Sequence, residues 1–176
     1  MNQEPIGIHS TGRRRLATQG NLSPDGLREG QQQMEAYLKK SIYENDILQE
    51  TTLNGMMKME SVGCSFAEGK MTMAYPVQPW QANRAGFMHG GAIGTAMDIS
   101  MGICARFYAG ESYAPTLELD MRYLRPVKIG DRLVVTCYVE AAGKSVIHIR
   151  GEARSEKSKK PVATATAFFM ATDNRK

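Results

Sequence analysis

The sequence is poor in the residues that build metal sites and disulfide frameworks. Its 176 residues include three cysteines and three histidines, and these show no paired spacing of the kind that binds zinc or iron. An odd number of cysteines also argues against a disulfide framework and favours a reducing compartment. We therefore expect no metal ion, and Cys64, Cys104 and Cys137 are predicted to be small buried hydrophobic residues.

Long apolar runs are missing as well. The first 26 residues contain no apolar core of signal-peptide length. The apolar stretch from about residue 92 to 105 contains Asp98 and is too short to cross a bilayer. The expectation is a cytoplasmic protein that does not insert into a membrane.

Positive charge is in slight excess, with a formal net charge of +4. It is concentrated in Arg13–Arg15 and in the lysines of 157–160. No aromatic platform or recognisable nucleic-acid motif accompanies these residues, so they are predicted to be solvated side chains that bind no nucleic acid.

The composition is that of one domain with an extension, because 42% hydrophobic residues in 176 suffice for a single core. We assign residues 1–45 to a tail and an amphipathic helix, and residues 46–173 to the main domain. Ser23 as cap and Pro24 at the first helical position predict a helix of about 19 residues. Its apolar positions recur at helical spacing: Leu27, Met34, Leu38 and Ile42. A second short helix around Ile47, Leu48, Thr51 and Leu53 is predicted to close near Gly55.

After this helix the pattern changes to extended segments separated by short turns. Six strands are predicted, at about 57–65, 68–76, 114–125, 131–142, 145–155 and 161–172. One long apolar helix, beginning at Gly91, separates the second strand from the third. Strands joined by short turns pair antiparallel, and a lone apolar helix has to bury itself against the concave face of such a sheet. The predicted class is α+β, a curled antiparallel sheet around one central helix.

The segment from Asn83 to Arg106 carries the most chemistry. A glycine-rich loop lets backbone approach a ligand, and the first turn of the following helix leaves N–H groups without internal partners. Those of Gly91 and Ala92 can donate to a carbonyl oxygen that gains negative charge in a transition state. Asp98 is the only acid between Arg84 and Arg106, and buried acids are common at active sites.

Helix geometry sets a condition on this site. Gly91 and Asp98 are seven residues apart, which separates them by roughly 10 Å along one helix. One helix therefore cannot bring both groups to a single carbonyl carbon. If both act on it, the second group comes from another copy of the helix lying antiparallel, which predicts a homodimer with two composite sites. Such dimers can pair again into tetramers through exposed sheet faces or edges.

These residues resemble the hotdog-fold acyl-CoA thioesterases of the phenylacetate-pathway (PaaI-like) type. The resemblance is carried by Asn83, by His89-Gly90-Gly91 and by Asp98 at their present spacing. It continues through segments in the same order: 116–126, 130–131, 143–144 and 161–168. It covers roughly residues 46 to 172, and it implies the hotdog fold and hydrolysis of an acyl-CoA to free acid and thiol. Coenzyme A is then part of the substrate, and no separate cofactor is expected.

The resemblance also implies roles for individual residues. Asn83 and His89 help to position the thioester, and Thr116 holds the attacking water. Asp98 either attacks the carbonyl or orients and deprotonates that water, and the sequence leaves both open. For His89 a structural role stays open beside this one, in which the ring fixes the glycine-rich turn through a backbone hydrogen bond.

Residues that bind other parts of the substrate are predicted less directly. Gly90 and Met88 belong to the loop that faces the thioester, and Arg122 and Arg125, with Lys128 nearby, are candidates for the coenzyme A phosphates. Trp80 and the pair Phe107-Tyr108 are candidates for the acyl pocket or for ordinary core.

Two other functions remain open. One is hydratase or dehydratase chemistry on an acyl thioester, which would pair His89 with Asp98. The other is a non-catalytic acyl-CoA sensor, supported by the basic run Arg13–Arg15 in the extension. Loss of thiol release on substituting Asp98 separates the hydrolase from both.

Overall fold

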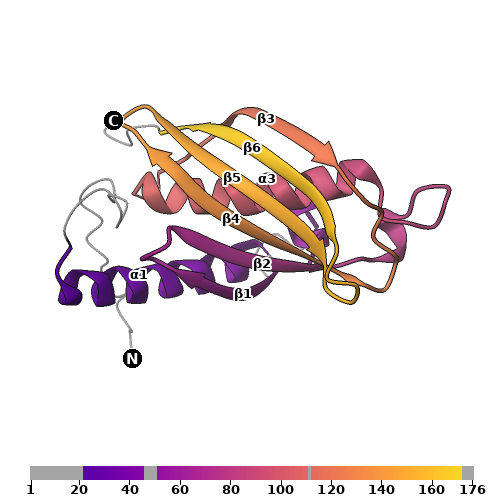
Figure 1. Ribbon diagram of the computed structural model, residues 1–176, viewed down its shortest axis with the longest axis horizontal. Coiled ribbons are helices and arrows are strands. Elements are labelled where there is room, and N and C mark those ends of the chain that lie inside the picture. Colours follow the sequence, from indigo (N-terminus) through magenta and orange to yellow (C-terminus); the bar gives the residue numbers. More distant parts are fainter. Residues whose placement is uncertain (1–21, 46–50, 111, 172–176) are drawn as a thin grey trace.

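The computed structural model describes residues 22–45, 51–110 and 112–171. One six-stranded sheet curls around one long helix, and a second long helix runs along its lower edge (Figure 1). The helices are α1 (Pro24–Tyr43), α2 (Leu53–Met56), the short 3-10 helix η3 (Pro79–Gln81) and α3 (Gly90–Tyr108). The strands are β1 (Glu60–Ser65), β2 (Lys70–Pro76), β3 (Thr116–Tyr123), β4 (Arg132–Ala142), β5 (Val146–Ser155) and β6 (Pro161–Met170).

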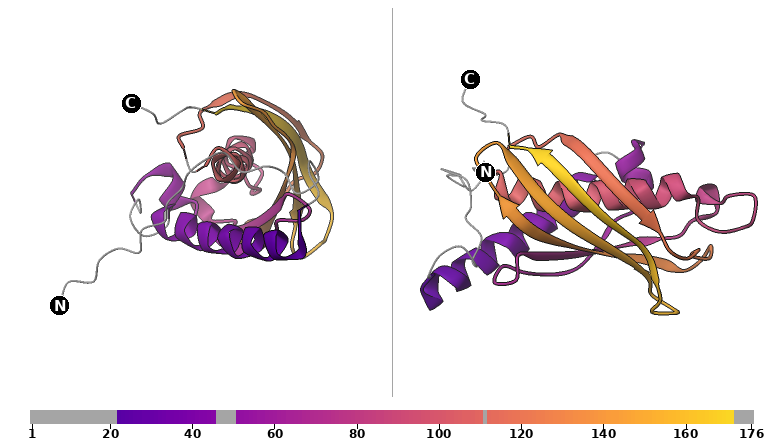
Figure 2. Two further views of the ribbon diagram at one scale, coloured as in Figure 1. Left: turned by 90° about the vertical axis from the view of Figure 1, so that its left-hand side faces the viewer. Right: turned by 45° about the horizontal axis from the view of Figure 1, so that its top comes forward.

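The sheet has the strand order β1-β2-β4-β5-β6-β3, and each neighbouring pair is antiparallel. Seen along the helix, the strands wrap around α3, which lies inside the curl (Figure 2). The buried residues of α3 pack on the inward-facing side chains of β2, β4, β5 and β6. The packing is tight at Gly151 of β5, where a Cβ atom would lie 2.8 Å from Met97 Cε. The predicted α+β arrangement is confirmed.

All six predicted strands are present, and each is shorter than predicted by one to three residues at one or both ends. The largest difference is at β1, which begins at Glu60 rather than near Met57. Met57 caps the end of α2, and Lys58 has a left-handed backbone with φ of 51°. The chain therefore leaves the helix through a sharp turn before it becomes extended.

The amphipathic helix is confirmed as α1, with Ser23 as its cap and Pro24 in its first turn. The Ser23 hydroxyl accepts a hydrogen bond from the Gly26 N–H at 3.2 Å. Thr52 caps the short helix α2 in the same way, through the N–H of Gly55. Ile47 and Leu48, which the sequence assigns to this second helix, lie outside the described residues, as does Arg13–Arg15.

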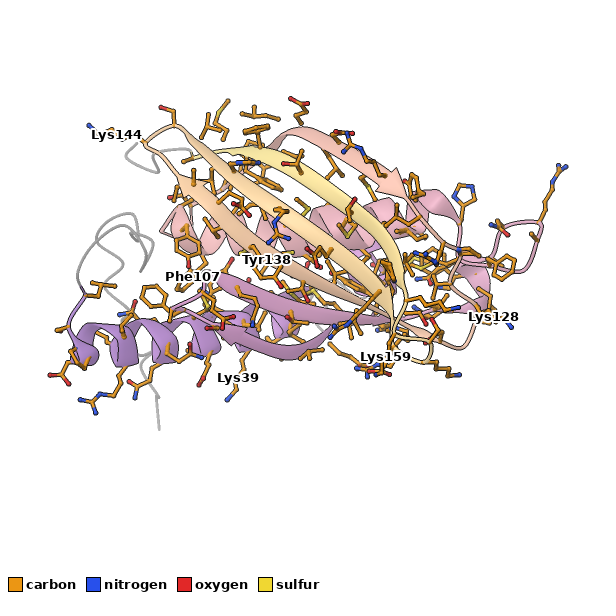
Figure 3. All side chains as sticks on the ribbon, viewed as in Figure 1. Lys39, Phe107, Lys128, Tyr138, Lys144 and Lys159 are labelled. Carbon is orange, nitrogen blue, oxygen red and sulfur yellow. The ribbon has the colours of Figure 1, made fainter. Side chains whose placement is uncertain are left out.

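The apolar face of α1 is part of the main core rather than a separate unit. Tyr37 packs on Phe107 of α3 with ring centroids 5.4 Å apart, and its hydroxyl donates to the carbonyl of Ile103 at 3.1 Å. Phe66, next to β1, completes the cluster edge-on to Phe107 at 6.3 Å. Figure 3 shows Phe107 in the space between the sheet and α1. The extension therefore closes the side of the core that the sheet leaves open.

Replacing Gly30 by alanine is expected to destabilise the protein by about 1–3 kcal/mol, the usual cost of overpacking a core. A Cβ atom at this position would lie 2.2 Å from Cε1 of Phe66, and that ring is held against Phe107. The steric cost exceeds the gain of about 1 kcal/mol in helix propensity. Urea unfolding of both proteins measures the difference.

Gly26 supplies the matched control on the same helix. A Cβ atom there would have its nearest contact at 3.5 Å, to Oγ of Ser23. Gly26→Ala is therefore expected to leave stability unchanged or to raise it. Equal effects of the two substitutions would show that α1 does not pack on Phe66 as described.

Two further observations concern the described residues as a whole. They contain no cluster of three or more His, Cys, Asp or Glu side chains placed to hold a metal ion. None of their helices combines the length and apolar character needed to span a bilayer. Cys104 and Cys137 are fully buried free thiols, and burial raises the pKa of both above the ordinary value.

Candidate active site

The amino end of α3 is capped by the side chain of His89. The ring atom Nδ1 accepts a hydrogen bond from the Gly91 N–H at 2.9 Å, so a neutral ring carries its proton on Nε2. Of the two roles predicted for His89, the backbone contact is the one present in the structure. The N–H of Gly91 faces an exposed position and has an acceptor already, which a ligand oxygen would have to replace.

Asn83 shapes the loop that leads to this cap. Its side-chain oxygen accepts from the N–H groups of Ala85 and Phe87, at 2.9 and 3.2 Å. The turn is completed by Gly86, whose φ of 77° lies in the left-handed region that favours glycine. Because the amide oxygen is used within the loop, the NH₂ group is the part of Asn83 left to face a ligand.

Asp98 lies two turns further along α3 and is half-buried. Its Oδ1 atom accepts a hydrogen bond from the Thr116 hydroxyl at 2.8 Å. Thr116 is the first residue of β3, and the pairing of β3 with β6 shifts register between Thr116 and Glu118. Such an irregularity re-aims a side chain, and bulges are frequent next to active sites. The structure thus brings together two residues that are 18 positions apart and that the sequence analysis assigned to one site.

A buried hydrogen bond to the sheet fixes how α3 is rotated about its own axis. Ser100, on the opposite side of the helix from Asp98, exchanges a hydrogen bond of 2.7 Å with the Tyr75 hydroxyl of β2. Both residues are buried. Burial raises the pKa of Tyr75 far above the ordinary value, with a smaller contribution of the same sign from the Asp98 carboxylate. Tyr75 is therefore a neutral anchor that holds Asp98 toward β3.

A pocket of about 310 Å³ lies beside the amino end of α3. Its apolar lining comes from α2, η3 and the first turn of α3: Leu53, Met57, Trp80, Ala82 and Ala92. Its polar lining consists of Gln81, His89, Gly91 and Thr95. The pocket therefore contains the His89 cap and the Gly91 N–H bound to it, but neither Asp98 nor Thr116.

The other predicted binding residues lie outside this lining. Gly90 is the first residue of α3, and its carbonyl accepts from the Tyr123 hydroxyl at 3.1 Å. Met88 is 2% exposed and packs in the core. Arg122 is exposed and pairs with Asp120 at 3.1 Å, and Arg125 donates to the carbonyl of Pro161 at 3.4 Å.

The site therefore has two halves on one helix, the capped N–H of Gly91 and the pair Asp98–Thr116. The separation of about 10 Å expected from the spacing is preserved, because α3 is continuous from Gly90 to Tyr108. Sequence reasoning missed Leu53, Met57 and Gln81, which line the pocket. No signal in their local pattern marks them. The helix α2 has only four residues and η3 only three, and both are too short to show a helical period.

Comparison with known families matches residues 85–162 to the thioesterase superfamily. Among curated proteins, the mouse (Mus musculus) acyl-coenzyme A thioesterase THEM4 is 31% identical over 91 residues, which are 52% of this chain. The same match covers 38% of THEM4. The chain thus spans well under half the length of this relative.

Solved structures share the fold over a larger part of the chain. The PaaI protein from the phenylacetic acid degradation operon of E. coli has a TM-score of 0.68 and 19% identity, covering 82% of this chain and 96% of that protein. The smu.793 protein of Streptococcus mutans, solved bound to acetyl CoA, has a TM-score of 0.60 and 26% identity. It covers 67% of this chain and 91% of its own.

Proposed function

We propose that the chain is a thioesterase of the PaaI-like family and that it hydrolyses an acyl-CoA thioester to a free carboxylic acid and coenzyme A. The match of residues 85–162 to the thioesterase superfamily and the fold shared with the E. coli PaaI protein support this proposal. The main support is the hydrogen bond that Asp98 accepts from Thr116. Asp98 lies on the same helix as the N–H of Gly91. The acyl-CoA thioesterase name of the mouse relative and the acetyl CoA bound to the Streptococcus protein agree with this choice of substrate.

The N–H of Gly91 is the proposed donor to the thioester oxygen. The oxygen replaces Nδ1 of His89 as acceptor, and the partial positive charge of the helix end favours the negative charge that develops there. Asn83 holds the loop in shape, and the exposed His89 ring with the Asn83 NH₂ group position the thioester. These roles explain why a polar cap stands at the start of an otherwise apolar helix.

The carboxylate of Asp98 is the proposed catalytic group of the hydrolytic step. As a general base it takes a proton from a water held by Thr116, and the resulting hydroxide adds to the carbonyl carbon. As a nucleophile its carboxylate oxygen adds to that carbon directly, and water releases the acyl group in a second step. In both cases the C–S bond breaks and the coenzyme A thiolate leaves and is protonated.

A second copy of the chain is part of the proposal, because Gly91 and Asp98 of one chain are too far apart to share a carbonyl carbon. Two helices lying antiparallel would bring Gly91 of one chain to Asp98 of the other, in two equivalent sites. The exposed side chains of β3, an edge of the described sheet, suit such an interface. Leu117 and Tyr123 of β3 and the adjacent Leu124 are large apolar residues that are exposed in the single chain.

Basic residues near the loop are proposed to meet the phosphates of coenzyme A. Lys128 is exposed and forms an isolated bridge with Phe87 of the loop. Figure 3 shows Lys128 at the end of the molecule remote from Lys144. With Arg122 and Arg125 it supplies positive charge on the side of the site where the sheet ends.

Thiol release from short, medium, long and aromatic acyl-CoAs by the purified chain tests the proposal. Release that depends on the acyl group supports hydrolysis and gives the preferred substrate. A chain that binds these compounds without releasing thiol would be a sensor. Hydration of an unsaturated acyl-CoA without thiol release would show hydratase chemistry instead.

Thr116→Val is expected to lower kcat by roughly 10- to 100-fold, because a hydrogen bond to a charged group contributes about 1.5–3 kcal/mol. The substitution keeps the shape of the side chain and removes the hydroxyl that donates to Asp98. Steady-state kinetics on the best substrate measures the effect.

Thr116→Ser is the matched control, since it restores a hydroxyl at the same position. Its kcat should stay within a few-fold of the wild type. If valine and serine reduce kcat equally, the hydroxyl has no part in the reaction and Thr116 matters only for packing.

A further inference from the structure

The apolar end of the pocket comes from segments that precede the part of the chain matching the thioesterase superfamily, which begins at residue 85. Met57 in this lining is fully buried, whereas Leu53 and Trp80 are 54% and 46% exposed in the single chain. The polar end contains His89 and Gly91. A thioester whose oxygen meets Gly91 would therefore have apolar surface within reach on the side of α2.

Two glutamines hold this apolar surface in place. The Gln78 side chain donates to the carbonyl of Met56 at 2.8 Å, and that of Gln81 donates to the sulfur of Met57 at 3.4 Å. Gln81 is 2% exposed, and its backbone carbonyl accepts the His89 N–H at 2.7 Å. A buried residue whose side chain and backbone each bind a partner fixes the relative positions of the two partners. Through Gln81, the end of α2 and the cap of α3 are held in one unit.

The same unit is attached to the amino-terminal helix. Asn54 of α2 donates to the side chain of Asn45 at 2.8 Å, and Asn45 donates to the carbonyl of Ser41 in α1 at 2.7 Å. Asn45 is buried, so its side chain has a defined position between the two helices. The position of α2 over the pocket is therefore set by α1.

We propose that α2 and Trp80 form the end wall of the acyl subsite, and that Leu53 sets the longest acyl group that fits. This inference deepens the proposed function and depends on its acyl-CoA ligand. A volume of about 310 Å³ is at the lower end of the range of small-molecule sites, roughly 300–1,000 Å³. The subsite therefore takes compact apolar acyl groups rather than long chains, and α2, whose position is held by α1, sets this limit.

Trp80 is the only tryptophan in the chain, so its fluorescence reports directly on this wall. The experiment titrates the full-length Asp98→Asn variant, which is expected to leave the thioester intact, with saturated acyl-CoAs of increasing length and with coenzyme A alone. Acyl-CoAs are expected to change Trp80 emission, while coenzyme A alone leaves it unchanged. Affinity should rise with chain length up to a limit and then fall.

Leu53→Ala moves that limit to longer chains, with affinity for the first excluded chain rising roughly tenfold or more, as expected when a pocket gains room for extra methylenes. Met56→Ala is the matched control, because Met56 is 41% exposed on the same short helix and does not line the pocket. Its length profile should equal that of the parent protein.

Two outcomes overturn the inference: Trp80 emission that responds equally to coenzyme A alone, or equal length profiles for Leu53→Ala and Met56→Ala. Turnover by the wild-type chain and by Leu53→Ala with Asp98 intact is measured on the same compounds to separate the two proposals. Length-dependent binding without turnover supports the acyl subsite and refutes hydrolysis. Turnover whose dependence on acyl-chain length is unchanged by Leu53→Ala supports hydrolysis and refutes the subsite.

Discussion

Asp98→Asn is expected to lower kcat for the best acyl-CoA by roughly 10² to 10⁴-fold, the usual contribution of a general base. Asparagine has the size of aspartate and still accepts the hydrogen bond from Thr116, but it neither takes a proton nor attacks a carbonyl. KM should change little, because the pocket beside Gly91 does not include Asp98. Thiol release under steady-state conditions measures both constants.

The fold should survive this substitution. Asp98 is half-buried and its described hydrogen bond is kept by the amide oxygen, so the melting temperature should stay close to that of the wild type. Asp25→Asn, in the exposed first turn of α1, controls for the loss of one negative charge. An Asp98→Asn protein with unchanged kcat would remove Asp98 from the mechanism.

The strands and the central helix were predictable because their residues repeat. Alternating burial along β5 and β6 and the long apolar run of α3 appear in the sequence as patterns of several residues, each contributing to the same assignment. Ser23-Pro24 fixed the start of α1 for a local reason, since cap and helix are adjacent in the chain. Local signals of this kind need no knowledge of the tertiary structure.

The two halves of the candidate site differ in how far they could be foreseen. The separation of Gly91 and Asp98 along one helix follows from helix geometry alone. The contact of Thr116 with Asp98 depends on the pairing of β3 with β6 and on its register shift, which spacing within the chain does not determine. Thr116 was assigned to the site through the family resemblance.

The wall formed by Leu53, Met57 and Trp80 could not be predicted from spacing. It depends on side-chain amides of Gln78 and Gln81 that reach a backbone carbonyl and a sulfur more than 20 positions away. Polar residues in a loop usually indicate solvent exposure, and Gln81 is instead buried. Contacts that join distant segments through single side chains leave no periodic trace in the sequence.

The composite nature of the site has its own test. Gly91→Pro removes the N–H that would donate to the thioester oxygen, and it is expected to lower kcat by about 10² to 10³-fold. Proline is tolerated in the first turn of a helix, where Gly91 is the second residue of α3.

A mixed dimer of Gly91→Pro and Asp98→Asn chains contains one site with both defects and one with neither. Such dimers, isolated after co-expression with two different affinity tags, should regain about half of the wild-type activity, because one of two equivalent sites is intact.

A second pairing shows whether this recovery comes from the shared site. Thr116 and Asp98 are joined within one chain, so both belong to the same half of a composite site. A mixed dimer of Thr116→Val and Asp98→Asn chains then has a defect in each of its two sites and should stay at or below the activity of Thr116→Val alone. Recovery in the first pairing and not in the second requires that Gly91 of one chain act with Asp98 of the other. If the first pairing stays inactive while dimers form, each site lies within one chain, and Gly91 is then too far along α3 from Asp98 to act on the same carbon.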